Sequence, residues 1–189
     1  MEQDAPRYHP IAIGLHWLLA ACLLAQLFLG FWMEGVPKEP PGVRAGWFNL
    51  HKSTGLLLAL LVVARLLWRL THHPPDWPQT MPHWQQVAAR HSHRLMYLCM
   101  LVLPLSGFLG SSFTPYPIRF FGLALPRLWE ASAPLKELCT AAHVAASYAL
   151  VALVGLHVGA ALSHALRRDG VFGRMGWGRR MPQEETSLR

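Results

Sequence analysis

Four long apolar stretches alternate with shorter polar segments along the chain, at residues 11–33, 48–70, 93–113 and 138–166. Each is close to or above the ~20 residues that a helix needs to cross a bilayer core of ~30 Å. The pattern predicts an all-α membrane protein, with four transmembrane helices in one domain over residues 1–189 and a polar cytoplasmic tail at 167–189. The first stretch is too long for a cleavable signal, so we expect it to stay as the first helix.

Composition agrees with a membrane protein and indicates its orientation. Only 14% of the residues are charged against 52% hydrophobic, whereas a soluble domain usually has about a quarter charged. Eleven of the seventeen Lys and Arg fall on the side that holds both termini, which predicts that the N- and C-termini are cytoplasmic. The net charge of +7 then needs no nucleic acid as a partner, because the excess of Lys and Arg on the inner side accounts for it.

Two histidines of the last stretch, His143 and His157, are fourteen residues apart. On a helix this spacing leaves their side chains only ~40° apart around the axis and ~21 Å apart along it. A single helix would therefore present two imidazoles on one face at two depths of the membrane.

The number of residues between a histidine and a flanking Lys or Arg indicates how deep that histidine lies in the membrane, and this brings in two further histidines, His16 and His51. The matching spacings are nine residues from Arg7 to His16 against ten from His157 to Arg167, and seven from Arg44 to His51 against seven from Lys136 to His143. This predicts an inner pair, His16 with His157, and an outer pair, His51 with His143. Two six-coordinate haems b need two axial ligands each. A lone intramembrane histidine is about as often a hydrogen-bonding residue of the bundle, but four at paired depths favour a bundle that encloses two haems b.

The glycines near these histidines are weaker evidence for haem binding, and the cysteines do not form a motif for covalent haem. Gly55 follows His51 by one turn, and Gly155 and Gly159 flank His157, where they would let a flat macrocycle approach the backbone. Taken alone, Gly155 and Gly159 favour close helix packing instead. The chain has no Cys-x-x-Cys-His motif for covalent haem and no nucleotide fingerprint, so we expect it to move electrons without a bound nucleotide.

Several short motifs, taken together, resemble the prokaryotic cytochrome b561 family over about residues 7–175. They are Arg7-Tyr8-His9-Pro10, Leu15-His16-Trp17, His51-Lys52-Ser53-Thr54-Gly55, Leu103-Pro104-Leu105-Ser106-Gly107, His143, His157, Ala161-Leu162-x-His164, Arg168-Asp169-Gly170 and Arg174-Met175. The resemblance implies four helices and two haems b in a bacterial inner membrane. Carried over by position, it makes His16 and His157 ligands of the inner haem and His51 and His143 ligands of the outer haem.

Two more histidines are candidates for quinone binding or proton transfer. His93 matches a family histidine, and it is either a ligand in place of His16 or a quinone residue; its position three residues after Arg90 suggests that it is shallower than His157. His164 returns to within ~20° of the His157 face, where it would hydrogen-bond a quinone or extend to the lipid interface. We expect the histidines around the Pro-rich inner loop to be solvated, namely His72, His73, His83 and His91.

Lys52 and Arg44 lie beside the outer pair, and Arg119, Arg127 and Lys136 fall in the outer loops. Together they would form a positive mouth that steers an anion towards the outer haem. For any one of these cations, pairing with a haem propionate or a lipid phosphate is the more ordinary role.

Two function classes fit. In the first, which the resemblance implies for members that stand alone, superoxide gives an electron to the outer haem and the inner haem reduces ubiquinone. In the second, the chain is a cytochrome b subunit that relays electrons to quinone from a partner dehydrogenase or hydrogenase. The compact length, without a fifth span, favours the free-standing enzyme.

Overall fold

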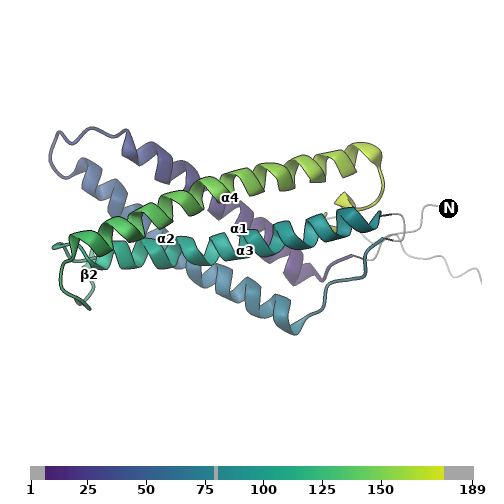
Figure 1. Cartoon of the computed structure of the whole chain (residues 1–189), viewed down its shortest axis with the longest axis horizontal. Coiled ribbons are helices and arrows are strands. Elements are labelled where there is room, and N and C mark those ends of the chain that lie inside the picture. The colour runs from purple at the N-terminus through teal and green to yellow at the C-terminus, as the bar shows by residue number, and fades with distance from the viewer. Residues whose placement is uncertain (1–6, 79–80, 177–189) are drawn as a thin grey trace, which may run out of the picture.

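The structure is a computed structural model that describes residues 7–78 and 81–176, and its long helices run side by side along one axis (Figure 1). The elements are α1 (Pro10–Glu34), α2 (Val43–Thr71), α3 (His83–Ser112), β1 (Arg119–Phe120), β2 (Leu123–Ala124), α4 (Ala133–Arg167) and the short 3₁₀ helix η1 (Phe172–Met175). All four α-helices are long and apolar enough to cross a membrane. The predicted four-helix membrane bundle is therefore confirmed.

Three helices begin earlier than the apolar stretches predict. α2 begins at Val43, α3 at His83 and α4 at Ala133, which is five, ten and five residues before the expected starts. Hydropathy identifies only the part of a helix that lipid would surround, so it did not predict the polar first turns of these helices. The expectation that His83 and His91 belong to the inner loop region is wrong, because both lie on α3.

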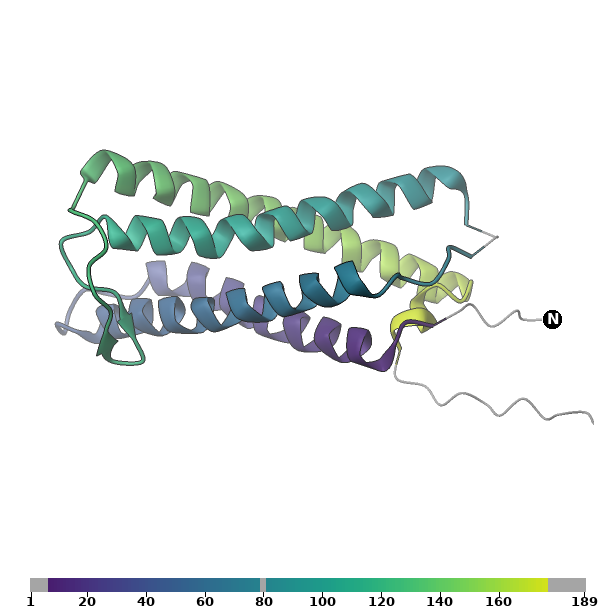
Figure 2. The ribbon, with the colours of Figure 1, turned by 90° about the horizontal axis from the view of Figure 1, so that it is seen from below.

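The helices form two pairs that lie one above the other in Figure 2. α1 packs mainly on α2, and α3 packs mainly on α4. All four helices contribute to one buried cluster, which consists of Leu19, Leu23, Val62, Met100 and Leu150. Leu150 is fully buried and lies seven residues from both His143 and His157 along α4. The core is thus a hydrophobic layer between the two histidine levels.

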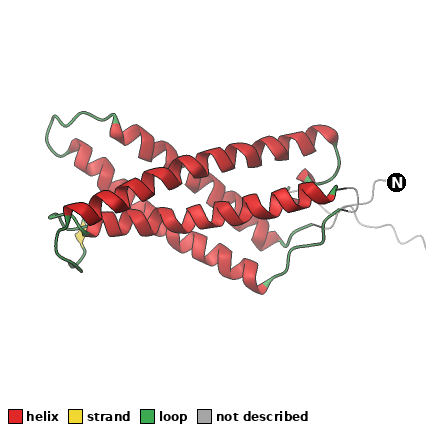
Figure 3. Ribbon diagram, in the orientation of Figure 1, coloured by secondary structure: helices red, strands yellow, loops and turns green. Residues whose placement is uncertain are grey.

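A small β-hairpin, which the sequence pattern did not predict, covers one end of the bundle, called here the β end (Figure 3). Phe121 and Gly122 form its tight turn, and both have positive φ, at 46° and 94°. Two central residues of this kind match the type I′ turn that suits the twist of a hairpin. The buried Ser53 of α2 anchors the turn, because its Oγ accepts a hydrogen bond from the Phe121 N–H at 2.9 Å.

The opposite end, called here the tail end, is closed by η1. Arg174 is only 4% exposed, and its guanidinium donates to the carbonyl oxygens of Pro75 and Asp76, each at 2.8 Å. The indole N–H of Trp17 donates to the carbonyl of Met175 at 2.8 Å. The segment after α4 therefore touches both α1 and the α2–α3 loop. Residues 177–189 of the predicted tail lie outside the described residues.

Candidate functional site

Two histidines face each other near the β end. His51 comes from α2 and His143 from α4, and their ring centroids are 6.2 Å apart with an interplanar angle of 80°. Two imidazoles on opposite sides of one metal would have ring centres about 6.3 Å apart, from metal–nitrogen bonds of about 2.0–2.1 Å and about 1.1 Å from nitrogen to ring centre. The observed separation therefore suits a metal ion held between the two rings, such as a haem iron.

Glycines of the two remaining helices make room for these rings. A Cβ atom on Gly30 of α1 would lie 3.1 Å from Cε1 of His51, and one on Gly107 of α3 would lie 3.1 Å from Cε1 of His143. The sequence pointed to other glycines. A Cβ on Gly155 or Gly159 would meet nothing within 4 Å, so their expected role in close helix packing is wrong for the described chain.

The two rings differ in what holds their Nδ1 atoms. His143 Nδ1 lies 2.8 Å from the carbonyl oxygen of Leu103, and because a carbonyl only accepts, the ring nitrogen must donate. This leaves the Nε2 lone pair free for a metal. His51 Nδ1 is buried and has no hydrogen-bond partner among the described residues.

Three histidines meet nearer the tail end. The ring of His157 on α4 lies 6.1 Å from that of His16 on α1, at an interplanar angle of 72°, and 5.3 Å from that of His93 on α3. The first separation is close to that expected across one metal, whereas the second is about 1 Å too short. His93 therefore lies beside His157. α3 begins early enough to place Arg90 inside the helix, so the spacing from Arg90 is not a measure of the depth of His93.

Arg65 of α2 contacts the same cluster. One of its guanidinium N–H groups donates to Nδ1 of His16 at 3.1 Å, and another donates to the Ala12 carbonyl at 3.2 Å. A guanidinium cannot accept a hydrogen bond, so this contact requires the ring proton of His16 on Nε2. His16 can offer Nε2 to a metal only after the bond to Arg65 is broken.

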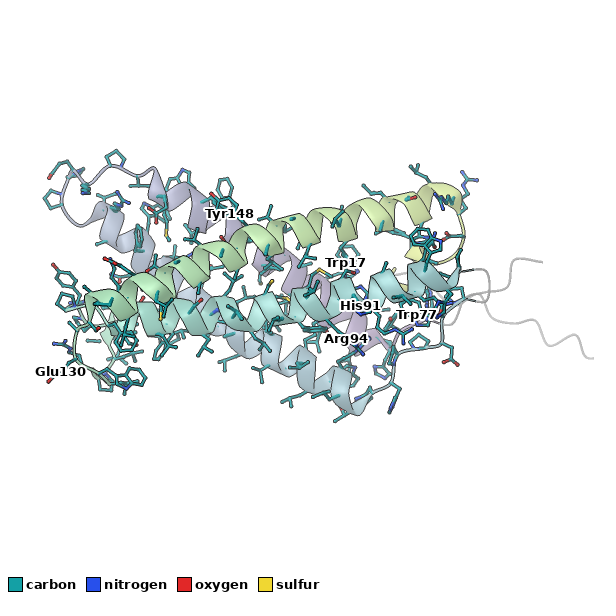
Figure 4. All side chains as sticks on the ribbon, in the orientation of Figure 1. Trp17, Trp77, His91, Arg94, Glu130 and Tyr148 are labelled. Carbon is teal, nitrogen blue, oxygen red and sulfur yellow. The ribbon has the colours of Figure 1, made fainter. Side chains whose placement is uncertain are left out.

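The last turn of α4 holds His164 against an acid. Its Nδ1 lies 2.6 Å from Oδ2 of Asp169, whose other oxygen accepts from the Val171 N–H at 3.2 Å. The expected solvated histidines lie outside both clusters: His72 stacks on Trp68 with ring centroids 3.7 Å apart, and the exposed His91 lies on α3 (Figure 4).

The expected steering cations differ in their surroundings. Arg44 forms an ion pair with Glu34, at 3.2 Å, which cancels its charge at short range. Lys52 is adjacent to His51 and partly buried, and no described residue forms a hydrogen bond or ion pair with its ammonium group. Arg119, Arg127 and Lys136 are exposed around the β end. Lys52 is therefore the stronger candidate for attracting an anion.

Comparison with known proteins gives consistent matches over most of the chain. The sequence model of the prokaryotic cytochrome b561 family matches residues 7–178. Cytochrome b561 homolog 2 of Escherichia coli (strain K12) is 30% identical over 175 residues, which cover 89% of this chain and 90% of that protein. Cytochrome b561 homolog 1 of the same strain is 26% identical over 173 residues, or 89% of this chain and 96% of that protein.

Proposed function

The chain belongs to the prokaryotic cytochrome b561 family, whose members transfer electrons across membranes through haem b, and from this premise we propose that it passes electrons from periplasmic superoxide to ubiquinone. The overall balance is two superoxide anions, one ubiquinone and two protons converted to two molecules of O2 and one ubiquinol. We further propose an inner-membrane location with both termini in the cytoplasm, so that the β end faces the periplasm.

The four paired histidines are the proposed ligands of two haems b. His51 and His143 would hold the outer group, and His16 and His157 the inner one. When bound, haem b supplies one-electron oxidation and reduction. The observation that carries the proposal is the pair of ring separations, 6.2 and 6.1 Å, each between helices of different pairs. The separation of 5.3 Å disfavours His93 as a ligand in place of His16.

His93 and His164 remain the candidates for the quinone end. Both lie towards the tail end, which this orientation places at the cytoplasmic side. The contact of His164 with Asp169 couples a titratable ring to a carboxylate, as a proton route to a reduced quinone would need. His93 lies against His157, so a quinone bound by His93 would be next to the inner haem site.

The test is reduction and reoxidation of the purified, haem-loaded protein without any partner. Under anaerobic conditions after a superoxide pulse, the haem absorption should change to that of the reduced form, and added ubiquinone should reverse it. A protein that superoxide leaves oxidised would contradict the free-standing enzyme. If that protein were still reduced by a dehydrogenase or hydrogenase, the result would favour the relay subunit instead.

A further inference from the structure

Gln26 is a polar side chain in the middle of the apolar helix α1, and it contacts α2 at the residue that carries the β-end imidazole. We propose that Gln26 is a positioning residue, which fixes the orientation of His51 towards its haem. The inference rests on the proposed ligand role of His51. Gln26 would act through the backbone carbonyl of His51.

The amide of Gln26 uses both of its ends on this stretch of α2. Its Nε2 donates to the backbone carbonyl of His51 at 2.7 Å, and its Oε1 lies 2.8 Å from Oγ1 of Thr54, whose single hydroxyl proton is shared with the Leu50 carbonyl, also at 2.8 Å. Because a carbonyl oxygen only accepts, the amide must direct its Nε2 at His51, and this sets its orientation. The carbonyl of His51 is therefore tied to α1 in addition to its place in the α2 helix.

Gly30 lies one helical turn beyond Gln26 and provides a second contact. A Cβ on Gly30 would lie 3.1 Å from Cε1 and 3.6 Å from Nδ1 of His51, so the imidazole rests directly on the α1 backbone. Gln26 and Gly30 together make a two-point socket, with one point on the His51 backbone and the other on its ring.

The two-point socket matters because no described residue forms a hydrogen bond with Nδ1 of the His51 ring. His143 is oriented by the Leu103 carbonyl, whereas His51 Nδ1 is buried without a partner among the described residues. Metal-bound histidines usually donate from their second nitrogen, and that bond sets the ring orientation. For His51, packing on Gly30 and the backbone bond to Gln26 are the contacts that we infer to set the orientation.

Gly55 gives a second observation that the amide position is specific. A Cβ on Gly55 would lie 3.0 Å from Nε2 of Gln26, which is tighter than most real Cβ contacts. The glycine four residues after His51 is thus explained by the space that the Gln26 amide needs. An alanine at this position requires the amide to shift by a few tenths of an ångström, and we expect this shift to lengthen the bond to the His51 carbonyl.

The main test is Gln26→Met, which keeps the length of the side chain and removes both hydrogen bonds. The outer haem signal is first assigned as the one lost in His51→Ala. In Gln26→Met we expect that signal to shift and broaden in low-temperature electron paramagnetic resonance, because its g-values depend on the orientation of the axial rings. We also expect about tenfold weaker binding of that haem, with the inner signal unchanged.

Gly55→Ala should produce the same shift, and adding it to Gln26→Met should produce no further change, since both act through one amide. Two matched controls should leave the outer signal unchanged. Cys22→Met changes the residue one turn before Gln26, on the same groove between α1 and α2. Gly46→Ala changes a glycine of α2 whose Cβ would meet nothing within 4 Å.

The outcomes separate the two hypotheses. If His51→Ala retains both haems, the proposed ligand is wrong and the role of Gln26 is overturned with it. If His51→Ala loses one haem but Gln26→Met leaves its g-values unchanged, only the positioning role is overturned. A lower unfolding temperature with unchanged g-values would identify Gln26 as a packing contact between helices, and would likewise overturn the proposal.

Discussion

The paired histidines differ in the groups that surround their second nitrogen. Leu103 accepts from His143, Arg65 donates to His16, and no described residue bonds Nδ1 of His51. A hydrogen bond from Nδ1 to an acceptor makes an imidazole a stronger electron donor to a metal, and its absence makes the ligand weaker. The proposed ligands are therefore expected to bind their haems with different strengths, and His16 only after its bond to Arg65 is broken.

Removal of one ligand should remove one haem. His143→Ala is expected to lose the outer haem or convert it to high spin while the inner haem stays intact, and His157→Ala should do the reverse. The haem-to-protein ratio and low-temperature optical spectra measure the change from two haems to one. His91→Ala, which removes an exposed histidine of α3, is the control and should keep two. A wild-type ratio of one haem per chain would refute the two-level arrangement.

The steering cations give a second prediction at this scale. Lys52→Gln should slow reduction by superoxide and weaken its dependence on ionic strength, because an unpaired positive charge next to His51 is lost. Arg44→Gln should have the smaller effect, since Glu34 already offsets the charge of Arg44. Stopped-flow rates at several salt concentrations measure both. Equal effects of the two substitutions would mean that the ion pair of Arg44 with Glu34 does not determine how strongly Arg44 attracts superoxide. Altered haem spectra would indicate a structural defect instead.

Sequence spacing identified the candidate site residues that repeat at helical intervals. It did not identify the residues whose role depends on contacts between helices. The depth argument paired His51 with His143 and His16 with His157, and the rings of each pair lie close together, with His93 as a third ring beside His157. Gly30, Gly107 and Gln26 were missed because their importance depends on which helix lies opposite, and no periodicity in one helix reveals that. The intramembrane position of a glutamine was the one available signal for Gln26.

At the scale of elements, η1 shows how a four-residue segment can join parts that are distant in sequence. Arg174 approaches the ring of Tyr8 before α1, with its guanidinium carbon 5.4 Å from the ring centroid, and it donates to two carbonyls of the α2–α3 loop. Burial lowers the pKa of this guanidinium. Arginine nevertheless keeps its charge in proteins, so the loop carbonyls face a buried cation.

Arg174→Met should destabilise the tail end. Hydrogen bonds to charged groups contribute about 1.5–3 kcal/mol each, so the loss of two predicts a fall of about 3 kcal/mol in the free energy of unfolding. Arg174→Lys should be intermediate, because it keeps the charge and loses the planar fork. Thermal unfolding in detergent measures the effect, and Arg167→Met is the exposed control. An unchanged unfolding temperature would show that the contact is not stabilising.

The helix ends illustrate the limit of hydropathy for elements. It located all four helices but not their polar first turns, and it gave no signal for the β1–β2 hairpin, which has two residues in each strand. The hairpin depends on a turn at Phe121-Gly122 and on a tertiary bond to Ser53. Such contacts cannot be inferred from an apolar pattern.

At the scale of the whole molecule, each histidine pair connects the two helix pairs. His16 and His51 belong to α1 and α2, whereas His157 and His143 both belong to α4. The most extensive packing occurs within each helix pair, α1 on α2 and α3 on α4. A group held between two imidazoles would therefore cross-link helices that otherwise contact each other less.

Loss of haem should therefore weaken the packing of the α1–α2 pair against the α3–α4 pair more than it weakens the individual helices. A ligand at about 1,000 times its Kd stabilises the folded state by ~4 kcal/mol, so two sites predict a large rise in unfolding temperature upon loading. Protein made without haem, and the double variant His143→Ala/His157→Ala, should unfold at similar lower temperatures and keep their helical circular dichroism below the unfolding transition. Cleavage by protease in the α2–α3 loop should accelerate in both, because this loop connects the two pairs. If loaded and depleted proteins unfolded alike, the histidines would not be holding the bundle together through a shared group.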